Sequence, residues 1–205
     1  MRTSVILFAE AILLFSGCSG KKPGPEAKTI LLIRGDVLCS SRENKGFVPA
    51  REGQFLSNKD ILTVADEAAC EVAVGRDTLF IGGGSRVNIS SKVTGKMVLM
   101  KVVLASGRIF FMDDERDPVP RQMLLLSKEA QGTTAKACFS IEKDNSATRF
   151  TVLSGSVKVK SRKAEGGLTV YAGQSAEIPA ETGVPVVQPI SDGEELHRHN
   201  ASWVL

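Results

Sequence analysis

The sequence predicts an all-β fold, a sandwich or a barrel, and three observations lead to this fold class. Hydrophobic residues alternate with polar ones along the chain, as in Cys70, Val72 and Val74, and this period of two places one face of a strand on a core. Turn-forming sequences such as Gly82–Gly84 and Glu165–Gly167 separate the alternating segments. Between residues 29 and 178 no long segment has the period of a helix, so an α/β nucleotide-binding fold is not expected.

The first predicted element is an export signal over residues 1–17. A basic Arg2 precedes the apolar run Val5–Phe15, and small residues follow up to Cys18. This arrangement resembles the lipobox of bacterial lipoproteins, in which the cysteine is lipidated and becomes the mature N-terminus. The resemblance implies that Cys18 is a lipid attachment site and that the protein is anchored to a membrane of the cell envelope, facing the periplasm or the surface.

Two features of the signal depart from the usual lipobox. Phe15 occupies a position that usually holds Leu, Val or Ile, and Glu10 interrupts the apolar run. The run is also shorter than the roughly 20 apolar residues that a permanent span requires. Plain secretion and an uncleaved anchor therefore remain the alternatives to a lipoprotein signal.

A flexible tether is predicted over residues 18–28. It contains glycine, proline and lysine without any apolar period, a composition that does not form a packed core. The β domain is expected to follow at residues 29–180.

Within the predicted β domain, a short phrase recurs in which glycine is followed two residues later by Val or Ile. It occurs at Gly35 with Val37, at Gly107 with Ile109 and at Gly155 with Val157. Glycine at the start of a strand supplies a turn with positive φ or a close approach of two backbones. The unequal spacing indicates a recurrent β-corner rather than a regular repeat array.

With these phrases the chain resembles the FecR domain family, named for the regulator of ferric citrate uptake. Two steps depart from the family pattern: Lys59 replaces a glycine, and Ala137-Cys138 replaces Gly-Thr. The matching segments keep the family order: Arg34–Val37, Lys59–Thr63, Cys70–Gly75, Leu104–Phe111, Ala137–Ile141, Leu153–Val159 and Ala172–Gln174. The resemblance implies a sandwich of jelly-roll or double-stranded-helix type.

The last predicted element is a proline-containing tail over residues 181–205 with a short C-terminal helix. Ser191 and Glu194 fit a capping box, and Leu196, Asn200 and Trp203 recur at helical spacing. The helix is expected to lay Trp203 against the sandwich, and docking to a partner is the alternative.

Composition bears on partners and on the redox state. The formal net charge is +3, and Lys and Arg are scattered among Asp and Glu with no basic stripe, so no nucleic-acid binding is expected. Apart from Cys18, the cysteines are Cys39, Cys70 and Cys138. They are interpreted as small buried hydrophobes. One disulfide with one free thiol is the alternative, although the sequence does not select the pair.

No catalytic, metal or cofactor site is predicted. His197 and His199 are expected to be solvated tail residues, and Gly82–Gly84 lacks the Lys-Ser/Thr ending of a phosphate loop. Asp36 and Asp60 are expected to cap turns rather than to form an acid/base pair. An acidic loop is interpreted as solvated, with calcium binding as the alternative; its residues are Asp113, Asp114, Glu115 and Asp117.

These elements predict a non-enzymatic, membrane-anchored envelope lipoprotein whose FecR-like domain acts as a protein-interaction or scaffold module. Its expected partners are the membrane, through the lipid, and an envelope protein. Relatives in the ferric citrate system regulate sigma factors, so one alternative is a regulatory component of such a pathway that acts through another membrane protein. The other alternative is a peptidoglycan- or ligand-binding β module.

Overall fold

A computed structural model describes residues 24–40, 46–113 and 119–190, and this part of the chain is all-β, as predicted. The signal sequence, Cys18, most of the acidic loop and the predicted C-terminal helix lie outside the described residues. Within the described residues there is no helix that could cross a membrane.

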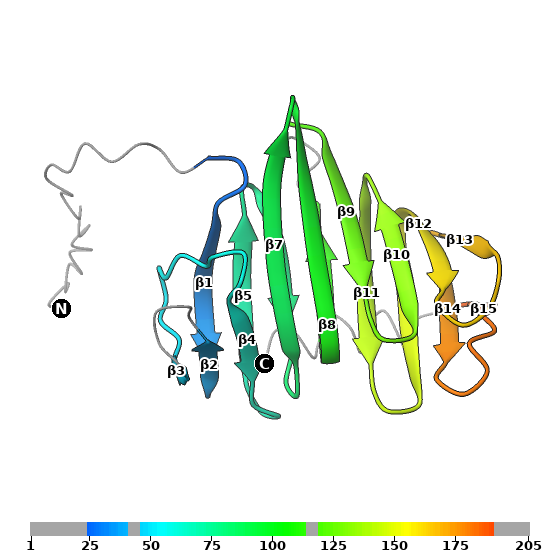
Figure 1. Cartoon of the computed structure of the whole chain (residues 1–205), viewed down its shortest axis with the longest axis horizontal. Coiled ribbons are helices and arrows are strands. Elements are labelled where there is room, and N and C mark those ends of the chain that lie inside the picture. The colour runs from blue at the N-terminus through cyan, green and yellow to red at the C-terminus, as the bar shows by residue number, and fades with distance from the viewer. Residues whose placement is uncertain (1–23, 41–45, 114–118, 191–205) are drawn as a thin grey trace, which may run out of the picture.

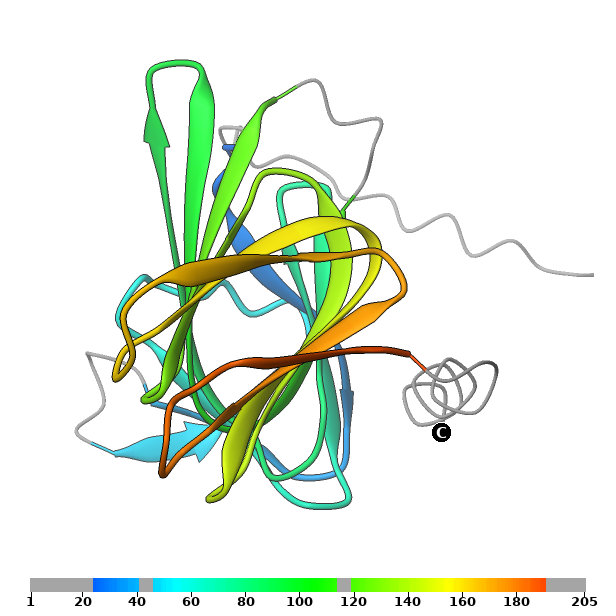
Figure 2. The same ribbon diagram turned by 90° about the vertical axis from the view of Figure 1, so that its right-hand side faces the viewer.

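The strands form two sheets that face each other (Figures 1 and 2). Sheet A has the order β1-β5-β6-β8-β11-β12-β14-β15, and sheet B has the order β3-β2-β4-β7-β8-β9-β10-β12-β13. Neighbouring strands are antiparallel, except that β8 and β9 are parallel. The long strands β8 (Met97–Met112) and β12 (Ala147–Ser161) belong to both sheets.

The remaining strands are shorter and belong to one sheet each. Sheet A contains β1 (Lys28–Arg34), β5 (Ala69–Val74), β6 (Asp77–Ile81), β11 (Ala137–Lys143), β14 (Gln174–Pro179) and β15 (Val186–Pro189). Sheet B contains β2 (Val37–Ser40), β3 (Phe47–Pro49), β4 (Ile61–Val64), β7 (Arg86–Thr94), β9 (Arg121–Leu126), β10 (Ala130–Thr134) and β13 (Gly167–Tyr171).

The core lies between the two sheets and contains the apolar half of each alternation. Sheet A contributes Phe139 and Phe150, both fully buried, and sheet B contributes Leu62, Met100 and Leu125. Burying a side chain of this size contributes about 1.5–3 kcal/mol, so the alternation read from the sequence also accounts for the main stabilising term.

The three glycine phrases are the corners at which the chain passes from one sheet to the other. Gly35 (φ 72°) connects β1 to β2, while Gly107 (φ 87°) and Gly155 (φ 74°) lie within β8 and β12 at their change of sheet. A Cβ atom at Gly107 would overlap Ser85, and one at Gly155 would overlap the carbonyl oxygen of Lys136. The predicted β-corners are therefore confirmed, because both the φ angle and the close backbone approach require glycine.

The folded body extends beyond the segment predicted as the β domain at both ends. Lys28, assigned to the tether, begins β1 and is buried, with its Nζ donating to Asn58 Oδ1 at 2.6 Å and to Ser91 Oγ at 3.1 Å. In the segment assigned to the tail, β15 pairs with β14. The composition of these two segments did not indicate the pairings. At Lys28 the buried contacts are polar, and β15 is a short, exposed edge strand, so neither segment has an alternation of apolar and polar residues.

Candidate interaction surface

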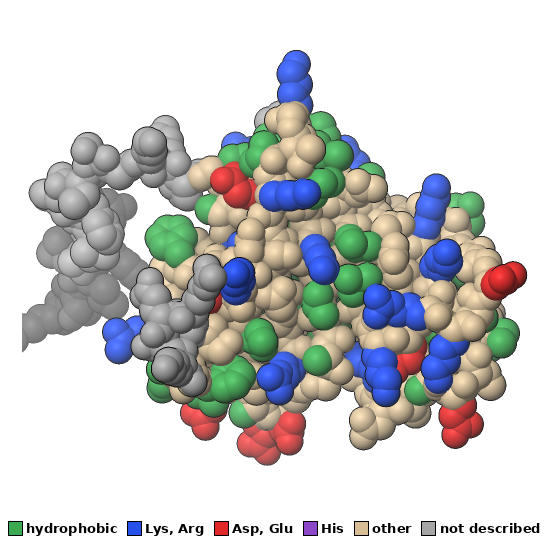
Figure 3. All heavy atoms as spheres, in the orientation of Figure 1, with side chains coloured by type: hydrophobic (Ala, Val, Ile, Leu, Met, Phe, Trp, Pro, Cys, Tyr) green, Lys and Arg blue, Asp and Glu red, His purple; other side chains and the backbone are tan. Residues whose placement is uncertain are grey.

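The outward side chains of sheet B carry one sign of charge. Among the described residues, no strand of sheet B contains Asp or Glu. The exposed cations on these strands are Arg86, Lys92, Lys101, Lys158 and Lys160. Figure 1 looks onto this side of the molecule, and Figure 3 shows Lys and Arg side chains spread around a central group of hydrophobic ones, with acidic side chains mainly at the margins.

Strand register places apolar side chains between these cations. One row across β7, β8, β9, β10, β12 and β13 contains Ser90, Lys101, Leu124, Thr133, Lys158 and Thr169. The next row contains Asn88, Val103, Leu126, Gln131, Lys160 and Gly167. We refer to the five cations together with Leu99, Val103, Leu124 and Leu126 as the cationic face.

A groove of about 460 Å³ lies on the cationic face. Its lining includes the polar side chains of Ser90, Lys92, Lys101, Gln122 and Thr133 and the half-buried apolar side chains of Leu99 and Leu124, with Asn58 at one edge. The lining therefore combines apolar surface with two lysine side chains and several hydrogen-bonding groups.

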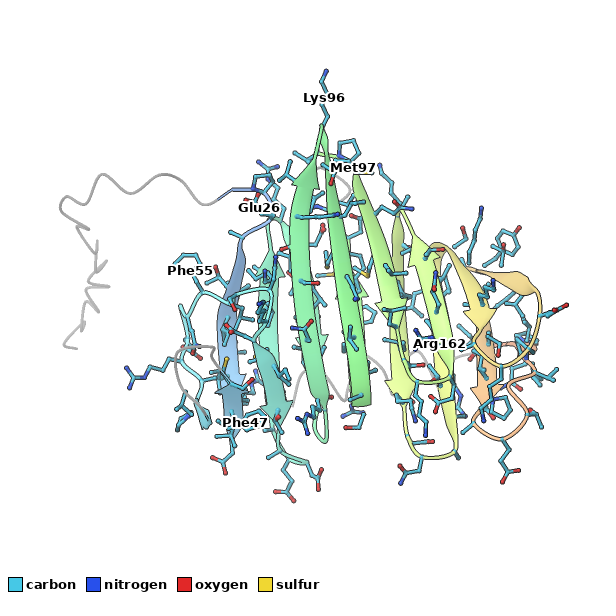
Figure 4. The ribbon with its side chains drawn as sticks, viewed as in Figure 1. Glu26, Phe47, Phe55, Lys96, Met97 and Arg162 are labelled. Atoms are coloured by element: carbon cyan, nitrogen blue, oxygen red, sulfur yellow. The ribbon has the colours of Figure 1, made fainter. Side chains whose placement is uncertain are left out.

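Hydrogen bonds fix the wall of the groove near Asn58. The Asn58 amide donates to the Ser91 carbonyl at 3.0 Å, and its Oδ1 accepts from the Ser91 backbone N–H at 2.9 Å. Ser91 Oγ in turn donates to the carbonyl of Glu26 at 2.6 Å, and burial lowers the pKa of the neighbouring Lys28. Figure 4 shows Glu26 at the same end of the molecule as Lys96, which lies in the projecting turn between β7 and β8, and Met97, which begins β8. The first described residues thus meet the sandwich beside the groove.

The outward charges of sheet A alternate in sign. Arg108, Glu142, Arg149 and Glu177 lie opposite one another on β8, β11, β12 and β14. The guanidinium of Arg149 contacts the carboxylate of Glu177 at 2.5 Å. Opposite charges directly across a pair of strands stabilise it modestly, by roughly 0.2–1 kcal/mol. On this side of the sandwich, charge is therefore compensated within the sheet.

Two buried ion pairs connect the sheets and have structural roles. Arg121 of β9 contacts Asp77 of β6 at 2.8 Å and also donates to the carbonyl of Val74. Lys143, at the end of β11, lies 3.4 Å from Glu129 in the turn between β9 and β10. Glu129 also accepts from Thr148 Oγ1 at 3.1 Å. All of these side chains are buried, so a substrate would have no direct access to them.

Two of the three cysteines are buried as the sequence predicted, and the third, Cys138, is not fully buried. Cys39 and Cys70 are buried in the core as free thiols, and Cys138 is a half-buried free thiol. Burial raises the pKa of Cys70 from 9.0 to about 12, and it raises the pKa of Cys39 as well. Both core thiols are therefore protonated and unreactive at neutral pH.

The other candidate residues belong to turns wherever they can be placed. Gly82–Gly84 forms the passage from β6 to β7, and Asp60 caps a turn by accepting from the Ser57 backbone N–H at 2.8 Å and from its hydroxyl at 2.6 Å. His197 and His199 lie outside the described residues. In the described ranges, no group of three or more His, Cys, Asp or Glu side chains is arranged to hold a metal ion.

The cationic face was missed by the sequence analysis, which found no basic stripe. Its four lysines and Arg86 come from β7, β8 and β12, which are far apart in the chain, and the described acidic residues between them lie in turns or in sheet A. The alternation of Lys158 and Lys160 with Val157 and Val159 is enough to place these two lysines outward. What it could not show is that these strands lie in the same sheet as Lys92 and Lys101.

The described fold is similar to that of a known protein. Two crystal structures of a "putative anti-sigma factor" from Parabacteroides distasonis each match with a TM-score of 0.52 and 14% sequence identity. Each match covers 63% of this chain and 59% of the other, so the chain spans less than two thirds of that protein's length. No family model and no curated protein matches the sequence. At this identity the similarity shows a shared fold.

Proposed function

We propose that this chain is a non-enzymatic regulatory module of a cell-surface signalling pathway that controls a sigma factor through another membrane protein. The observation that carries the proposal is the sandwich it shares with the Parabacteroides protein. The FecR-like phrases of the sequence add to it, because the resemblance implies a regulatory relative and the glycines of these phrases form the sheet-to-sheet corners of the same sandwich. In this role the domain acts by binding a protein.

The proposal includes a lipid anchor at Cys18, which keeps the module at the envelope membrane. Metabolic labelling with palmitate tests it directly. The wild-type chain should incorporate label and fractionate with membranes, and Cys18→Ala should do neither. Equal labelling of both proteins, or a wild-type chain that is unlabelled, would rule out the anchor.

Transcript profiling in the native bacterium tests the regulatory role. Deletion of the gene should change a small set of transcripts that depend on one alternative sigma factor. The wild-type gene should restore them, whereas the Cys18→Ala variant should not. An unchanged profile, together with a stable outer-membrane assembly containing the protein, would instead support the scaffold role expected from the sequence.

A further inference from the structure

We propose that the cationic face of sheet B is the docking surface of this module and that its partner is a protein segment carrying acidic and apolar side chains. The inference rests on the proposed function and deepens it by naming the surface and the chemistry of the partner. Its core is the groove, in which Leu99 and Leu124 lie beside Lys92 and Lys101.

The charge on this face is not compensated within the fold. Among the described residues, Lys92, Lys101, Lys158 and Lys160 are exposed and form no ion pair. Arg86 contacts an aromatic ring, that of Phe47, at 5.7 Å. A surface of one sign attracts a partner of the opposite sign and raises its association rate.

The spacing of the cations favours an extended acidic segment over a single small anion. Lys101 and Lys158 lie in the same row but three strand steps apart, which corresponds to about 14 Å at the usual strand spacing. Donors that bind one phosphate must converge on it, and these side chains do not share such a centre. Carboxylates distributed along a peptide can reach each of them.

The apolar side chains between the cations favour protein over nucleic acid. Leu99, Val103, Leu124 and Leu126 are half-buried and lie among the lysines. Single-stranded nucleic acids are usually bound through aromatic side chains on which bases stack. Among the described residues that pair within sheet B, the only aromatic ones are Phe47 on β3 and Tyr171 on β13, at the two edges of the sheet; the aromatic residues of β8 and β12 lie in their sheet A parts.

A binding assay with a defined peptide tests the proposal in the full-length chain. The probe is a fluorescein-labelled peptide of repeating Glu-Leu-Ser, about 12 residues long so that it spans several strands when extended. A matched peptide of repeating Lys-Leu-Ser is the control. Fluorescence anisotropy between about 50 and 300 mM salt should show binding of the acidic peptide only, weakening as salt screens the charges.

Charge reversals locate the binding surface. Lys101→Glu combined with Lys158→Glu should weaken binding of the acidic peptide at least about tenfold and flatten its salt dependence. The matched control combines Arg51→Glu with Lys136→Glu, exposed residues outside the strands of sheet B, and should change affinity less than about twofold. Leu124→Thr should weaken binding severalfold without altering the salt dependence, because it removes apolar contact only. Circular dichroism and thermal unfolding establish that each variant is folded.

Several results would overturn the inference. One is an equal loss of peptide affinity in the two double variants, and another is absence of peptide binding by the wild-type chain. A third is tighter binding of phosphatidylglycerol vesicles or duplex DNA than of the peptide, if that binding is lost in Lys101→Glu with Lys158→Glu. Concentration-dependent dimerisation that Lys101→Glu with Lys158→Glu abolishes would identify a second copy of the chain as the occupant and would also overturn it.

The same variants separate this inference from the proposed function. If the sheet B double variant loses peptide binding but still restores the transcripts of the deletion strain, regulation stands and the docking surface is wrong. If the peptide results hold while deletion leaves all transcripts unchanged, the surface stands and the regulatory role is wrong.

Discussion

The two sheets of this protein share the same alternation of buried and outward residues, yet their outward charges follow different rules. β12 shows the difference within one strand. Before Gly155, Arg149 lies in sheet A opposite Glu142 and Glu177, whereas after Gly155, Lys158 lies in sheet B opposite Thr133 and Thr169. Folding constrains the inward positions of both halves equally. Stability therefore does not account for the uncompensated charge at the outward positions of sheet B, which is where we place the docking surface.

A substitution that weakens the contact between the two sheets should lower the stability of the protein most. Arg121→Met removes the cation that β9 of sheet B presents to Asp77 of sheet A and leaves a buried carboxylate without it. We expect the free energy of unfolding to fall by about 3–5 kcal/mol. Urea denaturation measures this change, and Arg51→Met, at an exposed position, is the matched control. A loss below about 1 kcal/mol would show that the pair does not hold the sheets together.

The corner at Gly155 is the second connection between the faces. Gly155→Ala would introduce a side chain at positive φ and against the carbonyl of Lys136, and we expect a loss of about 2–4 kcal/mol in the free energy of unfolding. Gly166 also has positive φ but has open space around its Cβ position, so Gly166→Ala should cost only about 1–2 kcal/mol. Equal losses would mean that the close approach at the corner contributes nothing.

An alkaline titration distinguishes inward from outward positions. The pKa of Cys70 is raised to about 12, so above pH 9 the unfolded chain loses this thiol proton while the folded chain keeps it. Stability should therefore decrease as pH rises from about 9 to 12, by up to about 1.4 kcal/mol per pH unit. Urea denaturation across this range should show a shallower decrease for Cys70→Ala, and equal slopes would contradict the assignment.

Substitutions of the outward charges themselves should change the free energy of unfolding only slightly. Arg149→Glu places like charges opposite Glu142 and Glu177 in sheet A and should cost about 1 kcal/mol. Lys158→Glu, on the sheet B half of the same strand, should change stability by less than about 0.5 kcal/mol. Thermal unfolding at low and high salt measures both. A larger loss for Lys158→Glu would show that the cationic face contributes to folding.

The sequence supported the fold further than it supported the candidate surface. Alternation correctly predicted that Cys70, Val72 and Val74 face the core, and the glycine phrases correctly predicted corners, because both depend on local backbone geometry. The cationic face depends on register between distant segments. The parallel pairing of β8 with β9 places Lys101 beside Leu124, and no local pattern predicts such a pairing.

The burial of some polar residues could not be predicted from the sequence for a related reason. Lys28 and Asn58 look like solvated residues in a tether and a turn, and only their shared contact with Ser91 shows that they join the N-terminal segment to the sandwich. A polar residue is assigned to solvent by default when its partner lies tens of residues away. The structure is needed to supply that partner.

The start of β1 at Lys28 has a further consequence if Cys18 carries lipid as proposed. Ten residue steps separate the two positions, and a fully extended chain of that length reaches about 33–36 Å. The sandwich would then be confined to a thin layer next to the bilayer instead of diffusing through the whole compartment outside the membrane. A tether this short gives a membrane-bound partner a high effective concentration, so weak, salt-sensitive contacts would be enough for binding.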